Sequence, residues 1–265
     1  MVGITIGLLV VAVAMSALMV SRGVSGTVSD ASSIQQQAAY AMRNIGLQLR
    51  QSGSRWLNPN PTNAAGGQDA FAPVAFETKI PALGPGSNGF DPVTDTISST
   101  SGTLNLGYRR YTDSVFTSAT PISLARNCLG GPADTSDDLR VESIFQLVGT
   151  ELRCAGNSAV AQPIIQNVAE FQVRYLLQDV TTTPGSPQIR YADAATVGTN
   201  WNRVHGVEIC FVLYGNESIS MPPGSSYLAC DGATSVNMTT LAGARASRMH
   251  MVFRNVFQLR SQGLI

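Results

Sequence analysis

The chain has 265 residues, carries no formal net charge and contains only 13% charged residues, well below the usual quarter. This balance argues against a dedicated nucleic-acid binder, which is normally basic, and against a polybasic membrane-surface protein. The 44% hydrophobic content argues against outright disorder. Sparse charge together with many Ser, Thr, Asn, Gln and Gly residues is typical of an extracytoplasmic, β-rich protein.

The first 21 residues contain no charged side chain. Val2 to Val20 form an apolar run of about the length that crosses a bilayer as a helix. A cleaved signal peptide is the alternative, but it would have a basic start and a shorter apolar run. We therefore expect a retained membrane segment, with the remaining residues on one side of the membrane.

A second helical pattern follows this apolar run. Gly23–Thr27 is poor in helix formers and leaves two possibilities open: a bend or break with a new helix capped at Ser29 or Asp30, or a continuous, slightly frayed helix. The helix should end near Gln51, because Ser and Gly residues follow. Apolar residues recur at intervals of three and four, as on one face of a helix, at Val28, Ala31, Ile34, Ala38, Met42, Ile45 and Leu49. Polar residues, Gln48 among them, fall largely outside this stripe.

Strand patterns dominate the second half of the chain. Residues 53–100 are rich in Gly, Pro, Asn, Ser and Thr and indicate loops. Alternating or apolar runs predict strands at 103–108, 139–147, 151–154, 168–177, 204–214 and 249–259. There is no internal repeat and no βαβ rhythm. The expected fold class is α+β, with an N-terminal helical region at 1–52 (1–21 apolar, 28–52 amphipathic) attached to a mainly antiparallel β-sheet head at 53–265.

The chain contains four cysteines, Cys128, Cys154, Cys210 and Cys230. An even count in an exported domain indicates two disulfides. Sequence order favours 128–154 and 210–230, although three connectivities are possible. No C-x-x-C occurs and the two histidines are not spaced for zinc, so we expect neither a metal nor a cofactor.

No catalytic set of residues stands out, and we expect no enzymatic activity. The densest acidic cluster, Asp134, Asp137 and Asp138, fits a solvated loop better than a calcium site. After Asp231 the chain contains no acidic residue. The tail is therefore locally basic, and its arginines could contact DNA phosphates, although subunit pairing or a solvated strand face is favoured. These arginines are Arg245, Arg248, Arg254 and Arg260.

Four segments of the chain have recognisable sequence patterns. The apolar run is followed by SIQQQAAYAMRNIGLQLRQSG, and LRCAGN at 152–157 is followed by QPIIQNVAEFQVRYLL at 162–177. WNRVHGVEICFVLYG lies at 201–215 and SRMHMVFRNVFQLRSQG at 247–263. In this order the segments resemble the type IV pilin superfamily, and specifically the PilW-like minor pilins. Residues 55–100 contribute little to the resemblance.

The resemblance implies a structural filament subunit that partners with other pilins. Its apolar helix would lie in the inner membrane before assembly and would pack against equivalent helices in an extracellular filament afterwards. The residues implied in the filament core are Val2, Ile4, Ile6, Leu8, Leu9, Val11, Val13, Met15 and Leu18. Gly3 and Gly7 have the spacing that permits close helix approach, although incidental glycines explain it equally well.

The later half of the helix would pack on the sheet through Val28, Ile34, Ala38, Met42, Ile45 and Leu49. Aromatic and aliphatic strand residues would complete the core: Phe171, Val173, Tyr175, Ile209, Phe211, Leu213, Phe253 and Phe257.

Family members normally begin with a short basic leader that ends in Gly and is followed by Phe. We expect such text immediately upstream of Met1, and we assign no residue of this chain to the glutamate that pilins use for registration. The favoured function is a minor pilin that acts in pilus assembly or tip priming. A major repeating subunit and an anchored extracytoplasmic adhesin or binding module are the alternatives.

Overall fold

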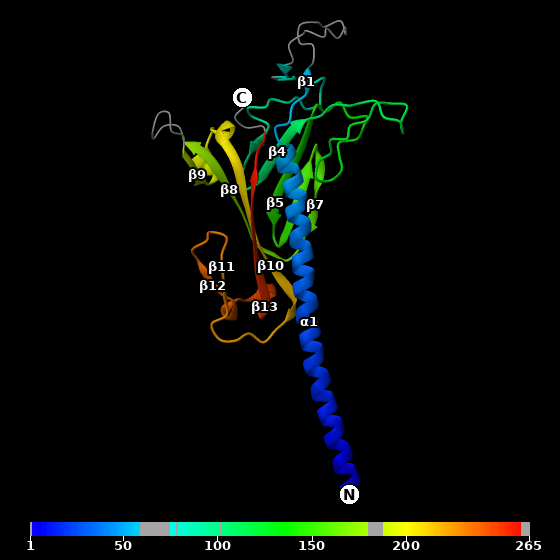
Figure 1. Ribbon diagram of the computed structural model, residues 1–265, viewed down its shortest axis with the longest axis vertical. Coiled ribbons are helices and arrows are strands. Elements are labelled where there is room, and N and C mark those ends of the chain that lie inside the picture. Colours follow the sequence, from blue (N-terminus) through cyan, green and yellow to red (C-terminus); the bar gives the residue numbers. More distant parts are fainter. Residues whose placement is uncertain (1, 59–74, 78, 101, 180–187, 261–265) are drawn as a thin grey trace.

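The computed structural model describes residues 2–58, 75–77, 79–100, 102–179 and 188–260. Helix α1 spans Val2–Gln51, and almost all remaining regular structure is β-strand. Figure 1 shows the first part of α1 extending beyond the strands, so that the N-terminus lies at one pole of the molecule. Residues 59–74 of the expected loop region and 261–263 of the last matching segment lie outside the described residues.

Helix α1 continues without interruption through the Gly-rich stretch. Of the two possibilities left open by the sequence, the continuous helix is the one found, and Ser29 and Asp30 lie inside α1 rather than at a cap. The reason is tertiary contact, which overrides weak helix propensity. The helix meets the end of a long strand here, and the side chain of Glu217 lies 3.7 Å from the position a Cβ would take at Gly26.

Two antiparallel sheets form the head. The first has four strands in the order β13-β10-β8-β9. Its strands are β8 (Val168–Asp179), β9 (Gln188–Ala192), β10 (Val204–Ser218) and β13 (Arg248–Gln258). The second has five strands in sequential order, β3 (Ile97–Ser98), β4 (Leu104–Arg109), β5 (Arg140–Val148), β6 (Glu151–Gly156) and β7 (Ala159–Ile165). The α+β class with antiparallel sheets is thus confirmed.

Short elements complete the fold. Two small hairpins pair β1 (Leu57–Asn58) with β2 (Ala75–Phe76), and β11 (Ser226–Leu228) with β12 (Ser235–Asn237). The short helices are α2 (Ala194–Val197), η1 (Trp201–Arg203), η2 (Met238–Thr240) and η3 (Gly243–Arg245).

Strand β10 lies at the centre of the first sheet and divides the core. Side chains alternate across a strand, so its residues enter two clusters. Val207, Ile209, Phe211 and Leu213 join the buried residues of α1 in the main core. Cys210 and Val212 face the other side of the sheet, where they pack with Cys230. Of the other predicted core residues, Tyr175 and Phe257 are buried, whereas Phe171, Val173 and Phe253 are half-buried against the main cluster.

Candidate assembly surface

The first third of α1 exposes apolar side chains. The residues expected in a filament core are each 50% to 74% exposed in the single chain: Val2, Ile4, Ile6, Leu8, Leu9, Val11, Val13, Met15 and Leu18. At Gly3 and Gly7, nothing lies within 4 Å of the position a Cβ would take. Among the described residues no helix is long and apolar enough to span a membrane, so the expected membrane-spanning segment is not supported.

Two polar residues interrupt this apolar surface, and the side chain of each forms a hydrogen bond within the helix. The hydroxyls of Thr5 and Ser16 donate to the carbonyl oxygens of Val2 and Val13, each at 2.8 Å. A buried hydroxyl is costly only when its hydrogen bond is missing. If another helix covered this surface, neither hydroxyl would be buried with an unsatisfied donor.

The later half of α1 buries one face in the head. Ile34, Ala38, Ala41, Ile45 and Leu49 are each at most 2% exposed, and Met42 is half-buried against the same cluster. Val28 is an exception at 64% exposed, so its expected packing is wrong. At about 100° per residue, Val28 lies about 120° around the helix from Ile34 and outside the buried arc.

Asp30 is the first buried residue of this face. Its carboxylate accepts hydrogen bonds from the backbone N–H groups of Asn216 at 2.9 Å and Glu217 at 3.3 Å. Gly215 leaves the space for this contact, because a Cβ there would overlap the carboxylate. Asp30 thus fastens α1 to the end of β10, a role that its charge gave no reason to expect in an apolar stripe.

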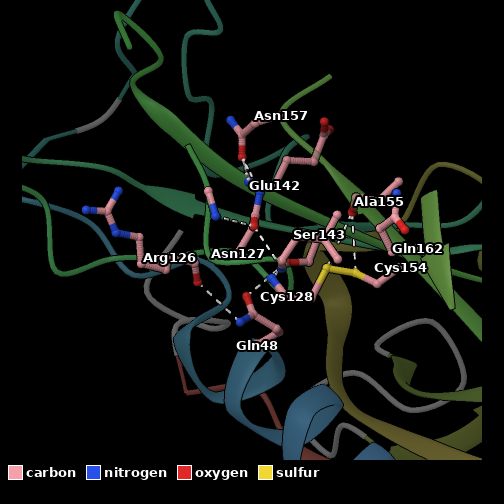
Figure 2. Close-up of a disulfide and its surroundings, with 12 residues drawn as sticks. Gln48, Arg126, Asn127, Cys128, Glu142, Ser143, Cys154, Ala155, Asn157 and Gln162 are labelled. Carbon is pink, nitrogen blue, oxygen red and sulfur yellow. Dashed lines mark hydrogen bonds between the residues drawn. A yellow bond between two sulfur atoms is a disulfide. The ribbon is translucent and has the colours of Figure 1, made fainter. Parts of the chain in front are cut away.

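Gln48 fastens the other end of the buried face. Its Oε1 accepts from the hydroxyls of Ser143 at 2.9 Å and Tyr108 at 3.3 Å, and its Nε2 donates to the carbonyl oxygen of Arg126 at 3.3 Å. Figure 2 shows Gln48, Ser143 and Arg126 grouped beside a disulfide. The expectation that Gln48 lies outside the packed face is wrong, because its hydrogen bonds compensate its burial. Burial also raises the pKa of Tyr108.

The cysteines form the pairs Cys128–Cys154 and Cys210–Cys230, with Cα–Cα distances of 6.4 and 5.6 Å. This is the pairing that sequence order favours. The first pair joins the loop beside Gln48 to β6, and the second joins the segment that carries β11 and β12 to β10. Each disulfide therefore fastens an irregular segment to one sheet.

The basic tail is partly engaged in contacts within the head. Arg245 donates to the Nε2 of His250 at 3.2 Å and to the hydroxyl of Tyr227. Arg254 donates to the carbonyl oxygen of Cys230 at 2.9 Å and lies 3.6 Å from the carboxylate of Glu208. Two of the four arginines considered for DNA contact thus serve the packing of the tail.

The three aspartates of the acidic cluster likewise have different surroundings. Asp134 pairs with Arg126 at 2.6 Å, and Asp138 accepts from the backbone N–H of Asn88 at 2.9 Å. Asp137 is exposed. Within the described ranges, no three His, Cys, Asp or Glu side chains are grouped as metal ligands would be.

Part of the head is similar in sequence to a known family. Residues 135–261 match the family model of the type IV pilus-assembly protein W. This part of the chain is PilW-like. The PilW-like region runs from just before β5 to beyond β13 and includes both cysteines of the second disulfide. This similarity to a type IV pilus-assembly protein covers just under half of the chain.

The comparison with solved structures is weaker. A type IV-like pilin from Thermus thermophilus is 12% identical, with a TM-score of 0.33 over 63% of this chain and 84% of that chain. A score this low does not establish a shared fold. No curated protein sequence matches the chain.

Proposed function

We propose that this PilW-like protein is a subunit of a type IV pilus-like filament, a minor pilin that acts in assembly or tip priming. Residues 2–18 would lie in the filament core, against the corresponding helices of other pilin subunits. The observation that carries the proposal is the division of α1. Its later half is buried in its own head, whereas its first third presents apolar side chains that this chain does not cover.

Burial of this surface supplies the driving force for assembly. A Leu, Ile, Val or Met side chain gains about 1.5–3 kcal/mol when it passes from water to full burial. A buried, unpaired charge would be costly in such a core, and the segment carries none. Gly3 and Gly7 leave room for a second helix to approach the backbone closely.

Residence of the chain in the inner membrane before assembly is a second part of the proposal. The same apolar side chains would contact lipid at that stage, and the head would face the periplasm. After assembly the chain would be in the extracellular filament. Retention of the full chain in washed membranes at alkaline pH, in cells that lack the filament machinery, supports this; its release with peripheral proteins contradicts it.

A charge within the apolar segment tests the filament core. Leu9→Arg should lower incorporation into sheared filaments at least tenfold, because the guanidinium would be buried without a partner. Val160→Arg is the matched control, since Val160 is 79% exposed on β7 of the head. Unchanged incorporation of the Leu9 variant would remove the filament-core role.

The amount of the chain in filaments separates a minor from a major subunit. A minor pilin is scarce in sheared filaments, and its deletion reduces the number of filaments made by another subunit. If this chain dominates the filament mass, it is instead a major repeating subunit. A chain that stays monomeric and never enters filaments would favour the anchored binding module.

A further inference from the structure

A pocket of about 490 Å³ lies in the head beside the start of β1. Figure 1 shows β1 at the end of the molecule away from the N-terminus. Trp56, Arg110, Tyr111, Asp113 and Asp137 are among the residues that line the pocket. The pocket is thus remote from the surface proposed for assembly.

The floor of the pocket is fixed by a buried arginine. Arg110 is 4% exposed, and its guanidinium donates to the backbone carbonyl oxygens of Ala133, Asp134, Ser136 and Asp138 at 2.8–3.1 Å. These bonds wrap the loop at 133–138 around one planar cation. The wall that carries Asp137 is therefore held in place before any ligand arrives.

Two carboxylates on the rim have no partner among the described residues of the chain. The structure gives the carboxylates of Asp113 and Asp137 neither a hydrogen bond nor an ion pair among its described residues. The backbone of Asp113 is nevertheless positioned, because its N–H donates to Ile122 at 2.9 Å and its carbonyl accepts in return at 3.0 Å. Two exposed carboxylates therefore lie at one pocket on backbone segments that are held in place.

Two aromatic rings accompany these acceptors. Trp56 is 44% exposed and Tyr111 48% exposed, so each ring leaves a surface open to a ligand. Aromatic rings bury much apolar area at a defined geometry, and they bring an indole N–H and a phenol hydroxyl as polar groups. A concave site with aromatic surface and a few fixed polar groups has the composition of small-molecule sites.

We propose that this pocket binds a neutral oligosaccharide. A pyranose ring offers apolar C–H faces to Trp56 and Tyr111, and its hydroxyls can donate to Asp113 and Asp137. The aromatic surface favours a neutral ligand with apolar faces, and the positive charge of Arg110 weakens the attraction of the two carboxylates for a cation. The hydrogen bonds of Arg110 go to carbonyl oxygens rather than to a carboxylate, so its positive charge offsets one of the two unpaired negative charges.

Titration of the full chain tests this proposal. The protein is purified in a detergent without sugar headgroups and titrated with maltotetraose, cellotetraose and chitotetraose, with tetralysine as a cationic probe. Tryptophan fluorescence and calorimetry report binding. We expect one or more of the tetrasaccharides to bind with a Kd between about 10 μM and 1 mM, and tetralysine to bind at least tenfold more weakly.

Variants connect binding to the pocket. Trp56→Ala and Asp113→Asn should each weaken tetrasaccharide binding about tenfold or more. Phe116→Ala is the matched control, because Phe116 is a fully exposed aromatic residue that does not line the pocket. The tetrasaccharide affinity of this variant should be unchanged. Trp56→Phe retains a ring and should retain most of the affinity, which separates loss of the site from loss of the fold.

Three results would overturn the proposal: no binding of any tetrasaccharide, unchanged binding by the Trp56→Ala variant, or tighter binding of tetralysine than of the sugars. The proposal does not rest on the filament role. Filament incorporation of the pocket variants is measured separately and should be normal, so failure of one proposal leaves the other standing.

Discussion

Asp30 and Gln48 are polar residues on the buried face of α1, one at each end of its contact with the head. Each is accommodated because every close partner is a hydrogen-bonding group: backbone N–H groups for Asp30, and two hydroxyls with a carbonyl oxygen for Gln48. Apolar packing is non-directional, whereas these bonds are directional. We infer that the two residues set where along the sheet the helix lies.

Removal of the Asp30 carboxylate should destabilise the head. In Asp30→Ala, the N–H groups of Asn216 and Glu217 lose a charged acceptor. Loss of hydrogen bonds to a charged group should cost about 1–3 kcal/mol. The effect is measured as a lower free energy of unfolding in urea, together with faster hydrogen exchange at those two amides. Ser29→Ala, at an exposed neighbouring position, should change the free energy by less than about 0.5 kcal/mol. Equal effects of the two substitutions would contradict the anchoring role.

His250 should make the stability of the tail depend on pH. It is buried between the rings of Tyr227 (5.1 Å between centroids) and Tyr214 (5.8 Å), and it faces Arg245. Burial, with a smaller contribution from Arg245, lowers its pKa below the usual 6.5, although a hydrogen bond to the carbonyl of Arg248 opposes this. The folded state therefore binds this proton less readily than the unfolded state does.

The sign of the pH dependence follows. Above about pH 6.5 the imidazole is neutral in both states, and stability is unaffected by this group. As the pH falls from there through the lowered pKa of the folded state, stability is lost. Urea unfolding at pH 7.5 and pH 5.5 should show a larger decrease for the wild-type chain than for His250→Gln. His205→Gln is the control, and a decrease in the His250 variant equal to that of the wild type would refute the assignment.

At the scale of elements, the close approach of α1 to β13 depends on Gly46. A Cβ at this position would lie 2.5 Å from the ring of Phe257, which is buried in the main core. Gly46→Ala should therefore destabilise the head by about 1–3 kcal/mol through overpacking, even though alanine favours helix.

Gly7→Ala provides the matched control for this prediction. Gly7 is also a helical glycine of α1, but nothing lies within 4 Å of its Cβ position, so the substitution should leave the unfolding of the head unchanged. Replacement of Phe257 by Leu in the Gly46 variant should restore part of the loss. The assay is urea unfolding of the full chain, and a Gly46 variant as stable as the wild type would show that the packing there is loose.

The elements that the sequence predicted are those with strong local patterns. Strands at 168–177 and 204–214 were expected, because apolar and β-branched residues run through them, and they are the core of β8 and β10. Strands β7 and β9 were not expected, since β7 contains Pro163 and both strands expose most of their side chains at the sheet edge. Edge strands lack the alternating burial that makes a strand visible in sequence.

The apolar segment of the candidate assembly surface also has a strong local pattern and was predicted. The two polar residues that fasten α1 to the head, Asp30 and Gln48, were not. A run of apolar residues at the start of α1 is visible without any tertiary information. Asp30 and Gln48 instead depend on partners 186 and 95 residues away, which no local pattern indicates. For a related reason, the sequence left open whether the helix breaks at Gly23–Thr27, because local propensity does not include the contact between α1 and the head.

At the scale of the whole molecule, the two proposed surfaces lie at opposite ends. Figure 1 shows α1 carrying its N-terminal part away from the head, whereas β1 lies near the other end of the helix. The pocket is lined by Trp56, which directly precedes β1. The disulfides and the Gln48 network make the intervening part a packed body. A rigid body between two surfaces allows each to act without changing the other.

This separation predicts that the two activities can be lost independently. Leu9→Arg should abolish filament incorporation and leave tetrasaccharide affinity within about twofold of wild type, since no residue of the pocket contacts that segment. Trp56→Ala should do the reverse. Their combination should show the sum of both defects, because distant sites without shared partners contribute additively. Affinity is measured by calorimetry on the purified chain and incorporation by its amount in sheared filaments. Loss of affinity in the Leu9→Arg chain would mean that the helix and the distal pocket are coupled through the head.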